Sequence, residues 1–186
     1  MAGQGLLEGV GDGRFEPDTA ITREQAALLL YRCAARLDMD AAALMAKTFQ
    51  FSDAGHVSGY AAQAVSWAAA NGLLLGSGGL LRPMDEVTRA QMAAVLTRIV
   101  ANPDHVEADS AYYRGQCKFT DVPDWAKVYV GYCAANHLVA GYGNGLYGPS
   151  DPVTPAAACT VMLRCLGDVD MEWTYSTACQ TAVELG

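Results

Sequence analysis

The chain has little of what marks membrane, nucleic-acid or metal-binding proteins. None of its apolar runs reaches the ~18 residues that a membrane-spanning helix needs, so membrane insertion is not expected. Its formal net charge of −8 argues against a nucleic-acid partner, which would need a basic surface. Its three histidines, His56, His105 and His137, lie at unrelated positions, so we expect no metal site.

Patterns typical of catalysis and of export are also missing. No nucleophile–base pair stands at a recognisable spacing and no phosphate-binding loop occurs, so we expect neither an enzyme nor a bound cofactor. The opening Met-Ala-Gly-Gln-Gly does not resemble a signal peptide, so export would need a signal outside this chain. An anionic partner stays possible, because screening over ~8 Å lets a few local arginines outweigh distant negative charge.

The six cysteines do not form a disulfide or metal-binding pattern. No Cys-x-x-Cys occurs, and Cys33 and Cys165 occupy the repeat position at which the middle copy holds Ile99. Cysteine that alternates with isoleucine behaves as a small buried hydrophobe. We therefore predict free thiols in the core, with disulfides as the alternative.

A sequence repeat dominates what is present. Two markers recur every 66 residues, a proline in a Gly-rich turn and a threonine that follows it: Pro17, Pro83 and Pro149, then Thr22, Thr88 and Thr154. A fixed period means that the repeat is the folding unit and that function lies on surfaces that the copies share.

Each copy is predicted to hold two helices. Thr22 and Thr88 begin capping boxes, and Thr154 is followed by proline at the first helical position. An apolar i, i+3, i+4, i+7 stripe follows each threonine, which gives the second helix a buried face. The first helix is expected at 59–71 and 125–136. Residues 38–48 and 102–116 are predicted to be linkers between repeats, and the first of them is expected to be helical over 41–47.

The copies are divided unevenly along the chain. The pattern gives a half-repeat at 5–36, whole repeats at 51–100 and 119–166, and a complementary half-repeat at 166–186. We expect one domain over 1–186, mainly all-α and pseudo-three-fold, with Gly/Pro-rich turns and minimal β-structure. The helix predicted at 173–185 would pack beside 5–36 and close the arrangement.

The recurring Phe-x-Asp, tryptophan-bearing helix, Gly-rich turn, Phe-x-Pro and Thr-Arg elements resemble the S-layer homology (SLH) domain. The resemblance covers nearly the whole chain. It implies a non-catalytic module, outside the cell on a bacterial cell wall or S-layer. Such a module binds a secondary cell wall polymer, a pyruvylated glycan, in grooves between repeats. It can carry a fused cargo domain outside this chain.

The resemblance makes Arg23 and Arg89 the central ligand-binding candidates. Each stands first in its helix, where a guanidinium fork and backbone N–H groups suit a pyruvate carboxylate. Solvated first-turn arginines are the alternative. Asp53 and Asp121 would accept sugar hydroxyls or orient the arginine, unless they are helix N-caps.

Four more residues complete the predicted ligand-binding set. Trp67 and Trp125 would give sugar-stacking faces, unless they belong to the core. Gly76 and Gly141 would let the backbone approach a ligand.

The third copy departs from the motif. Pro155 stands where the other copies have arginine, so its groove is expected to be weak as an anion site. This departure leaves a second function open, a structural or protein-interaction scaffold that has lost glycan binding.

Overall fold

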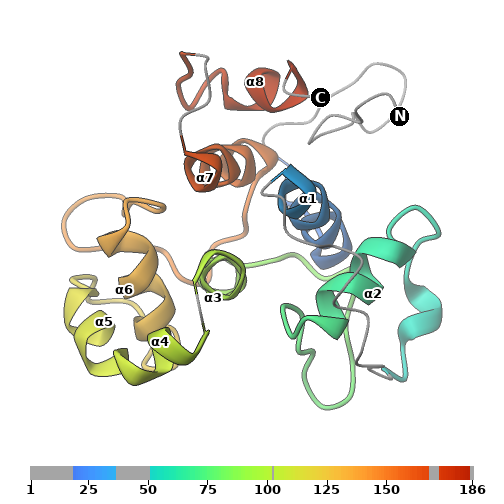
Figure 1. Cartoon of the computed structure of the whole chain (residues 1–186), viewed down its shortest axis with the longest axis horizontal. Coiled ribbons are helices and arrows are strands. Elements are labelled where there is room, and N and C mark those ends of the chain that lie inside the picture. The colour runs from blue at the N-terminus through green and yellow to red at the C-terminus, as the bar shows by residue number, and fades with distance from the viewer. Residues whose placement is uncertain (1–18, 37–50, 102, 168–171, 185–186) are drawn as a thin grey trace. The chain divides into compact units, whose positions relative to one another are not determined.

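The computed structural model describes residues 19–36, 51–101, 103–167 and 172–184, which are mainly helical (Figure 1). Their β-structure is confined to isolated bridges such as Thr22 with Glu86 and Thr88 with Pro152, which confirms the mainly all-α fold with minimal β. The helices are α1 Arg23–Arg36, α2 Ala62–Ala70, α3 Arg89–Val100, α4 Pro103–Ala108, α5 Ser110–Gln116, α6 Lys127–Ala135, α7 Pro155–Leu166 and α8 Ala178–Glu184, with a 3-10 turn at Ala54–His56.

The chain divides into two compact units. Met1–Glu86 and Thr154–Gly186 form unit 1, and Val87–Val153 form unit 2. The single closed domain over 1–186 stays a prediction. The predicted helix at 41–47 and the first part of the half-repeat, 5–18, lie outside the described residues.

The predicted capping boxes are confirmed. In α3 the Gln91 amide donates to Thr88 Oγ1 (3.3 Å), and the Thr88 amide donates back to Gln91 Oε1 (3.1 Å). Thr22 and Gln25 repeat both bonds at the start of α1. These caps satisfy first-turn donors that a helix leaves open, so they fix where each second helix begins.

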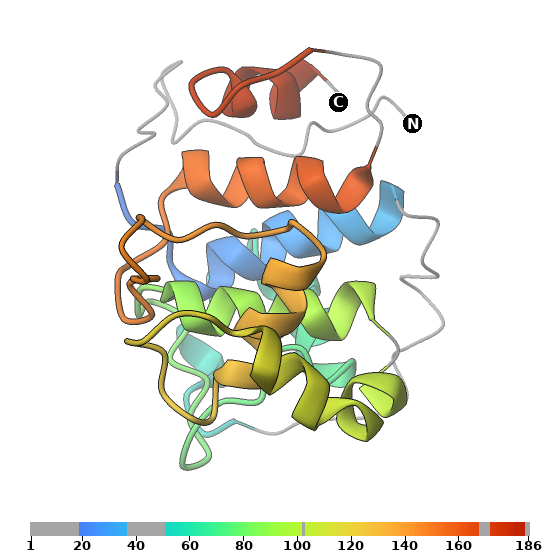
Figure 2. The same cartoon turned by 90° about the vertical axis from the view of Figure 1, so that its left-hand side faces the viewer.

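In unit 1, α2 packs on α1, and α7 lies between α1 and α8 (Figures 1 and 2). Small residues let the helices approach closely, and Ala34 of α1 and Ala68 of α2 are both fully buried. Trp67 lies edge-on to Tyr31 with ring centroids 5.4 Å apart. This aromatic pair joins α2 to α1.

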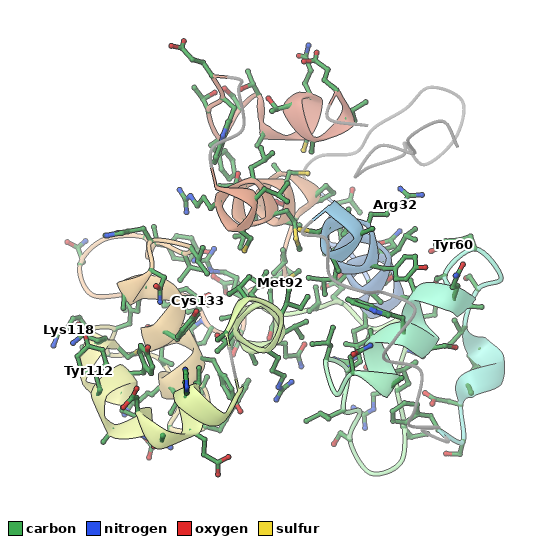
Figure 3. The ribbon with its side chains drawn as sticks, in the orientation of Figure 1. Arg32, Tyr60, Met92, Tyr112, Lys118 and Cys133 are labelled. Atoms are coloured by element: carbon green, nitrogen blue, oxygen red, sulfur yellow. The ribbon has the colours of Figure 1, made fainter. Side chains whose placement is uncertain are left out.

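In unit 2, α6 packs between α3 and α5 (Figure 1). Cys133 of α6 faces α3, where its sulfur lies 3.4 Å from the Thr97 hydroxyl (Figure 3). Burial raises the pKa of Cys133 to about 12, which keeps the thiol protonated and unreactive. None of the six cysteines, all of them among the described residues, forms a disulfide, and Cys33 and Cys159 of unit 1 are each buried as well. The prediction of core thiols is therefore confirmed for three cysteines, whereas Cys117, Cys165 and Cys179 are only partly buried.

The segment predicted as the second linker is instead a pair of short helices, α4 and α5. The sequence holds only one copy of this segment, so no second copy marks it as helical. α5 packs closely on α6 at Gly131, where a Cβ atom would overlap the Tyr113 carbonyl oxygen. The absence of a side chain at Gly131 therefore serves a helix–helix contact.

The final helix begins later than predicted. The sequence predicted a helix from residue 173, but α8 begins at Ala178, after a turn at 175–177. Ala178 is fully buried, as are Ala61 and Ala126 next to the starts of α2 and α6. α8 packs on α7, whereas its predicted packing beside 5–36 stays a prediction, since 5–18 lie outside the described residues.

Replacing Gly131 with alanine should destabilise the chain by about 1–3 kcal/mol, because the new methyl group forces α5 away from α6. Gly115 is the matched control, since a Cβ there meets nothing within 4 Å. Gly115→Ala should be neutral or stabilise by up to ~1 kcal/mol through helix propensity. Thermal unfolding followed by circular dichroism measures both, and equal effects would contradict the close α5–α6 contact.

Candidate functional site

The N-terminus of α3 is closed by the Pro-containing turn that follows α6 in the chain. The Arg89 amide donates to the Asp151 carbonyl (2.9 Å), and the Ala90 amide donates to the Pro149 carbonyl (3.0 Å). The Arg89 side chain adds a third bond, from Nε to the Tyr147 carbonyl (2.9 Å). We call these three bonds the clasp.

Unit 1 builds the same clasp from the matching residues. The Arg23 and Glu24 amides donate to the carbonyls of Asp85 (2.9 Å) and Pro83 (3.0 Å). Arg23 Nε donates to the Leu81 carbonyl (2.8 Å). The Thr-Arg helix of one copy therefore binds the turn of the next copy, which explains why both motifs recur at one period.

The clasp corrects the predicted anion site at each helix start. The two backbone N–H groups that were to bind a pyruvate carboxylate already donate to protein carbonyls in both copies. The Nε group of each arginine is also occupied. Any ligand at these arginines would have to bind the outer guanidinium edge.

Arg89 is held between aromatic rings. Its guanidinium carbon lies 4.5 Å from the ring centre of Tyr147 and 4.7 Å from that of Tyr142. Nη2 donates to the Ala140 carbonyl (2.8 Å), whereas Nη1 makes no hydrogen bond within the described residues. Tyr147 is buried, but Tyr142 is 62% exposed. The arrangement leaves one edge of an oriented cation beside an exposed ring.

Arg23 has a different environment. Burial lowers the pKa of its guanidinium, and the nearby Asp85 carboxylate opposes that shift. Leu81 stands where unit 2 has Tyr147, so this arginine lacks one of the two rings around Arg89. In unit 1, Ser77 takes the place of Tyr142. The Ser77 amide donates to the Leu80 carbonyl, just as the Tyr142 amide donates to the Leu146 carbonyl in the equivalent turn of unit 2.

The two predicted acids fix the clasped turns. Asp53 accepts from the amides of Leu81 (2.8 Å) and Arg82 (2.7 Å), and these bonds, the Leu81 one foremost, hold its pKa below the ordinary value. Asp121 accepts in the same way from Tyr147 (2.9 Å) and Gly148 (2.8 Å). Asp53 does stand at the N-cap position of the 3-10 turn Ala54–His56, but its side chain makes no cap bond there.

Gly76 and Gly141 also serve the turns. Gly76 has φ +64°, and a Cβ there would come within 2.6 Å of the Leu80 carbonyl and the Phe51 ring. At Gly141 a Cβ would overlap the Leu146 carbonyl and the Phe119 ring. The space that was predicted for a ligand is filled by protein in both turns.

The two predicted tryptophans differ in exposure. Trp67 is 1% exposed and belongs to the core, so its prediction as a sugar platform is wrong. Trp125 is 54% exposed and lines a cleft with side chains of α3, α4, α5 and α6.

Sequence reasoning missed two features of the site. The rings of Tyr142 and Tyr147 orient Arg89; their place in the Gly-rich turn was the available signal. Glu24 is a buried acid that accepts from the Ser58 amide (2.9 Å) and the Tyr60 hydroxyl (2.7 Å). It ties the loop before α2 to α1, whereas unit 2 has Ala90 in its place.

Comparison with known proteins agrees with this repeated architecture. The S-layer homology domain model matches residues 1–27, 50–93 and 118–158. The chain belongs to the S-layer homology domain family. This SLH assignment confirms the resemblance seen in the motifs, and it identifies a non-catalytic, cell-surface anchoring module.

Curated relatives of the SLH chain are much longer proteins. An amylopullulanase of Thermoanaerobacterium thermosulfurigenes is 26% identical over 87% of the chain and 8% of its own length. A cell surface protein of Thermoanaerobacter kivui is 33% identical over 48% of the chain and 12% of its own length. A cellulosome-anchoring protein of Acetivibrio thermocellus is 29% identical, again over 48% of the chain, and the chain spans 20% of it. None of the helices that the structure describes is long and apolar enough to cross a membrane.

Asp121→Asn should lower the melting temperature at neutral pH, because an amide group would face two backbone donors. Desolvation would raise the pKa of Asp121, but the bonds from Gly148 and Tyr147 and the charge of Arg89 lower it overall. A lowered pKa stabilises the fold above the unfolded value, about 3.9, and that contribution fades as pH falls below it.

The difference in melting temperature between wild type and Asp121→Asn should therefore be largest near pH 7 and shrink below about pH 4. Asp124→Asn is the control, since Asp124 is an exposed acid paired only with Lys127 at the surface and should change little. A difference for Asp121→Asn that does not vary with pH would contradict the carboxylate's role in the turn.

Proposed function

We propose that the chain attaches a larger protein to the bacterial cell wall by binding a secondary cell wall polymer, a pyruvylated glycan. The binding surfaces are those around Arg89 and Arg23. The observation that supports this most is the Arg89 guanidinium, oriented by backbone carbonyls and stacked beside the exposed ring of Tyr142.

The chemistry of such a glycan suits the Arg89 surface. A ketal-linked pyruvate carries a carboxylate, which would accept from the open Nη1 edge of Arg89 in a charge-assisted bond. The apolar face of the attached sugar would pack on Tyr142. Because the guanidinium is already held in place, little side-chain entropy would be lost on binding.

The copies should contribute unequally. Arg23 has Ser77 and Leu81 where Arg89 has Tyr142 and Tyr147, so its surface offers no aromatic platform of the same kind. Pro155 removes the guanidinium from the third copy. We therefore expect the Arg89 surface to carry most of the affinity.

A scaffold that has lost glycan binding is the second candidate. It is favoured by Pro155 and by the internal use of the helix-start N–H groups, which leaves less binding chemistry at each junction. In that case the repeats would serve structure or protein contacts, and cargo in the longer protein would reach the surface by another route.

Co-sedimentation with purified cell-wall sacculi tests the proposal. The chain should pellet with intact sacculi and stay soluble after the wall polymer is removed. Tyr142→Ala keeps the clasp and should weaken pelleting several-fold, and adding Arg23→Ala and Arg89→Ala should abolish it. Circular dichroism checks that each variant is folded.

Tyr112→Ala is the matched control, because Tyr112 is a similarly exposed tyrosine of unit 2 away from Arg89. It should pellet like wild type. Equal pelleting with stripped sacculi, or a folded Tyr142→Ala variant that binds unchanged, would favour the scaffold function instead.

A further inference from the structure

The cleft beside Trp125 lies apart from the clasp and wholly within unit 2. It encloses about 370 Å³ and is lined by residues including Thr97, Arg98, Glu107, Ser110, Arg114 and Trp125. Residues 94–117, which supply most of these side chains, lie outside the segments that the SLH model matches. The cleft is therefore built mostly by the α4–α5 insertion and α3, and Trp125, Val128 and Tyr129 complete it.

Trp125 has an exposed side chain on a backbone that its neighbours fix. Val122 and Ala126 are buried on either side of it, so the backbone that carries the indole is anchored to the core. Its counterpart in unit 1, Tyr60, is instead bound by the buried carboxylate of Glu24. Unit 2 has Ala90 at the position of Glu24, so no such bond holds the ring of Trp125.

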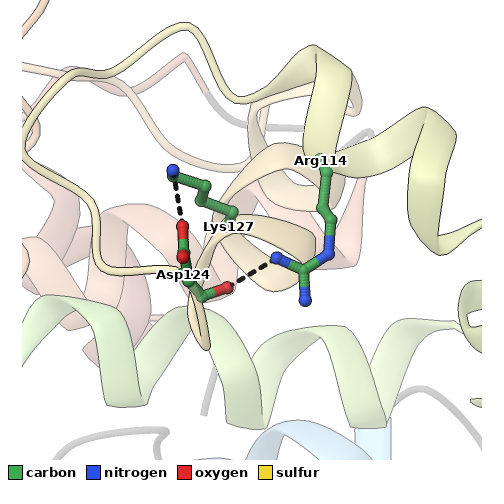
Figure 4. A network of polar contacts seen from close by, with 3 residues as sticks. All are labelled: Arg114, Asp124 and Lys127. Carbon is green, nitrogen blue, oxygen red and sulfur yellow. Dashed lines mark hydrogen bonds and ion pairs between the residues drawn. The ribbon is translucent and has the colours of Figure 1, made fainter.

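The polar groups around the indole are also oriented. Arg114 Nη1 donates to the Asp124 carbonyl (2.9 Å), and the Asp124 carboxylate pairs with Lys127 Nζ (2.7 Å) (Figure 4). The guanidinium of Arg98, which also lines the cleft, lies 5.3 Å from the ring centre of Tyr129. Neither arginine has to be ordered from a solvated, disordered state to face the cleft.

The cleft is lined by hydrogen-bond donors, hydrogen-bond acceptors and apolar side chains. The arginines are donors, whereas the Glu107 carboxylate and the Ser110 hydroxyl can accept and make no hydrogen bond within the described residues. The Thr97 hydroxyl donates its proton to the Ala93 carbonyl (2.9 Å), so it has no proton left to donate to a ligand. Sugar hydroxyls need both donors and acceptors, and the Glu107 carboxylate would repel a strongly anionic ligand.

We propose that this cleft is a second carbohydrate subsite, which takes an uncharged pyranose ring stacked on Trp125. A volume of about 370 Å³ is at the small end of ligand pockets and suits one or two sugar rings. Indole faces stack on the C–H face of a pyranose, while the arginines, Glu107 and Ser110 bind its hydroxyls. The subsite goes beyond the proposed function, because it needs neither Arg89 nor a pyruvyl group.

Titration of the ¹⁵N-labelled chain with the neutral trimer of N-acetylglucosamine tests the subsite by NMR. The indole N–H of Trp125 and backbone amides of α5 should shift saturably. Trp125→Ala should weaken binding at least tenfold, and Trp125→Tyr should restore most of it by keeping an aromatic face. Tyr175→Ala, an exposed tyrosine of unit 1, is the control and should bind like wild type.

The same titration separates this subsite from the proposed function. Tyr142→Ala should leave trimer binding unchanged even if it weakens binding to sacculi. The proposal is overturned if no saturable shift occurs, if Trp125→Ala binds as wild type does, or if only an anionic saccharide perturbs the Trp125 signal.

Discussion

The clasp is the interaction on which the rest of the chain depends. It joins the first turn of one helix to a Pro-containing turn 58 to 62 residues later, through two backbone bonds and one arginine bond. Helix-start N–H groups need partners when they are buried. Because the partner comes from the next copy, neither the helix nor the turn is complete within a single repeat.

Because the clasp uses the helix-start N–H groups, a binding partner can reach only groups on the outside of the clasp. The groups that a helix N-terminus would offer to an anion are used inside the protein, and the turn glycines and aspartates are used to shape the clasped turn. What remains for a partner is the outer guanidinium edge and the rings beside it. The copies differ most in those rings, Tyr142 against Ser77, so a regular scaffold presents irregular surfaces.

Local features were predictable from the sequence, and long-range partners were not. Capping boxes and apolar stripes act within one turn of helix, so Thr22, Thr88 and the buried face after each were read correctly. The clasp partners are far apart in sequence, and a repeat looks the same whether an element binds its own copy or the next.

The burial of the two tryptophans also could not be predicted from the sequence. Trp67 and Trp125 both fall in stretches predicted as the first helix of a repeat, and only packing decides that one is buried against Tyr31 while the other lines a cleft. The insertion that forms the cleft has no second copy in the chain, so the repeat gave no indication that it is helical.

Amide hydrogen exchange at the helix starts tests the clasp most directly. If the clasp holds, the N–H groups of Arg23, Glu24, Arg89 and Ala90 should exchange as slowly as helix-interior amides, and added wall glycan should not change their rates. Fast exchange at these four amides that becomes slow only when glycan is added would contradict the account, because the helix starts would then be open anion sites.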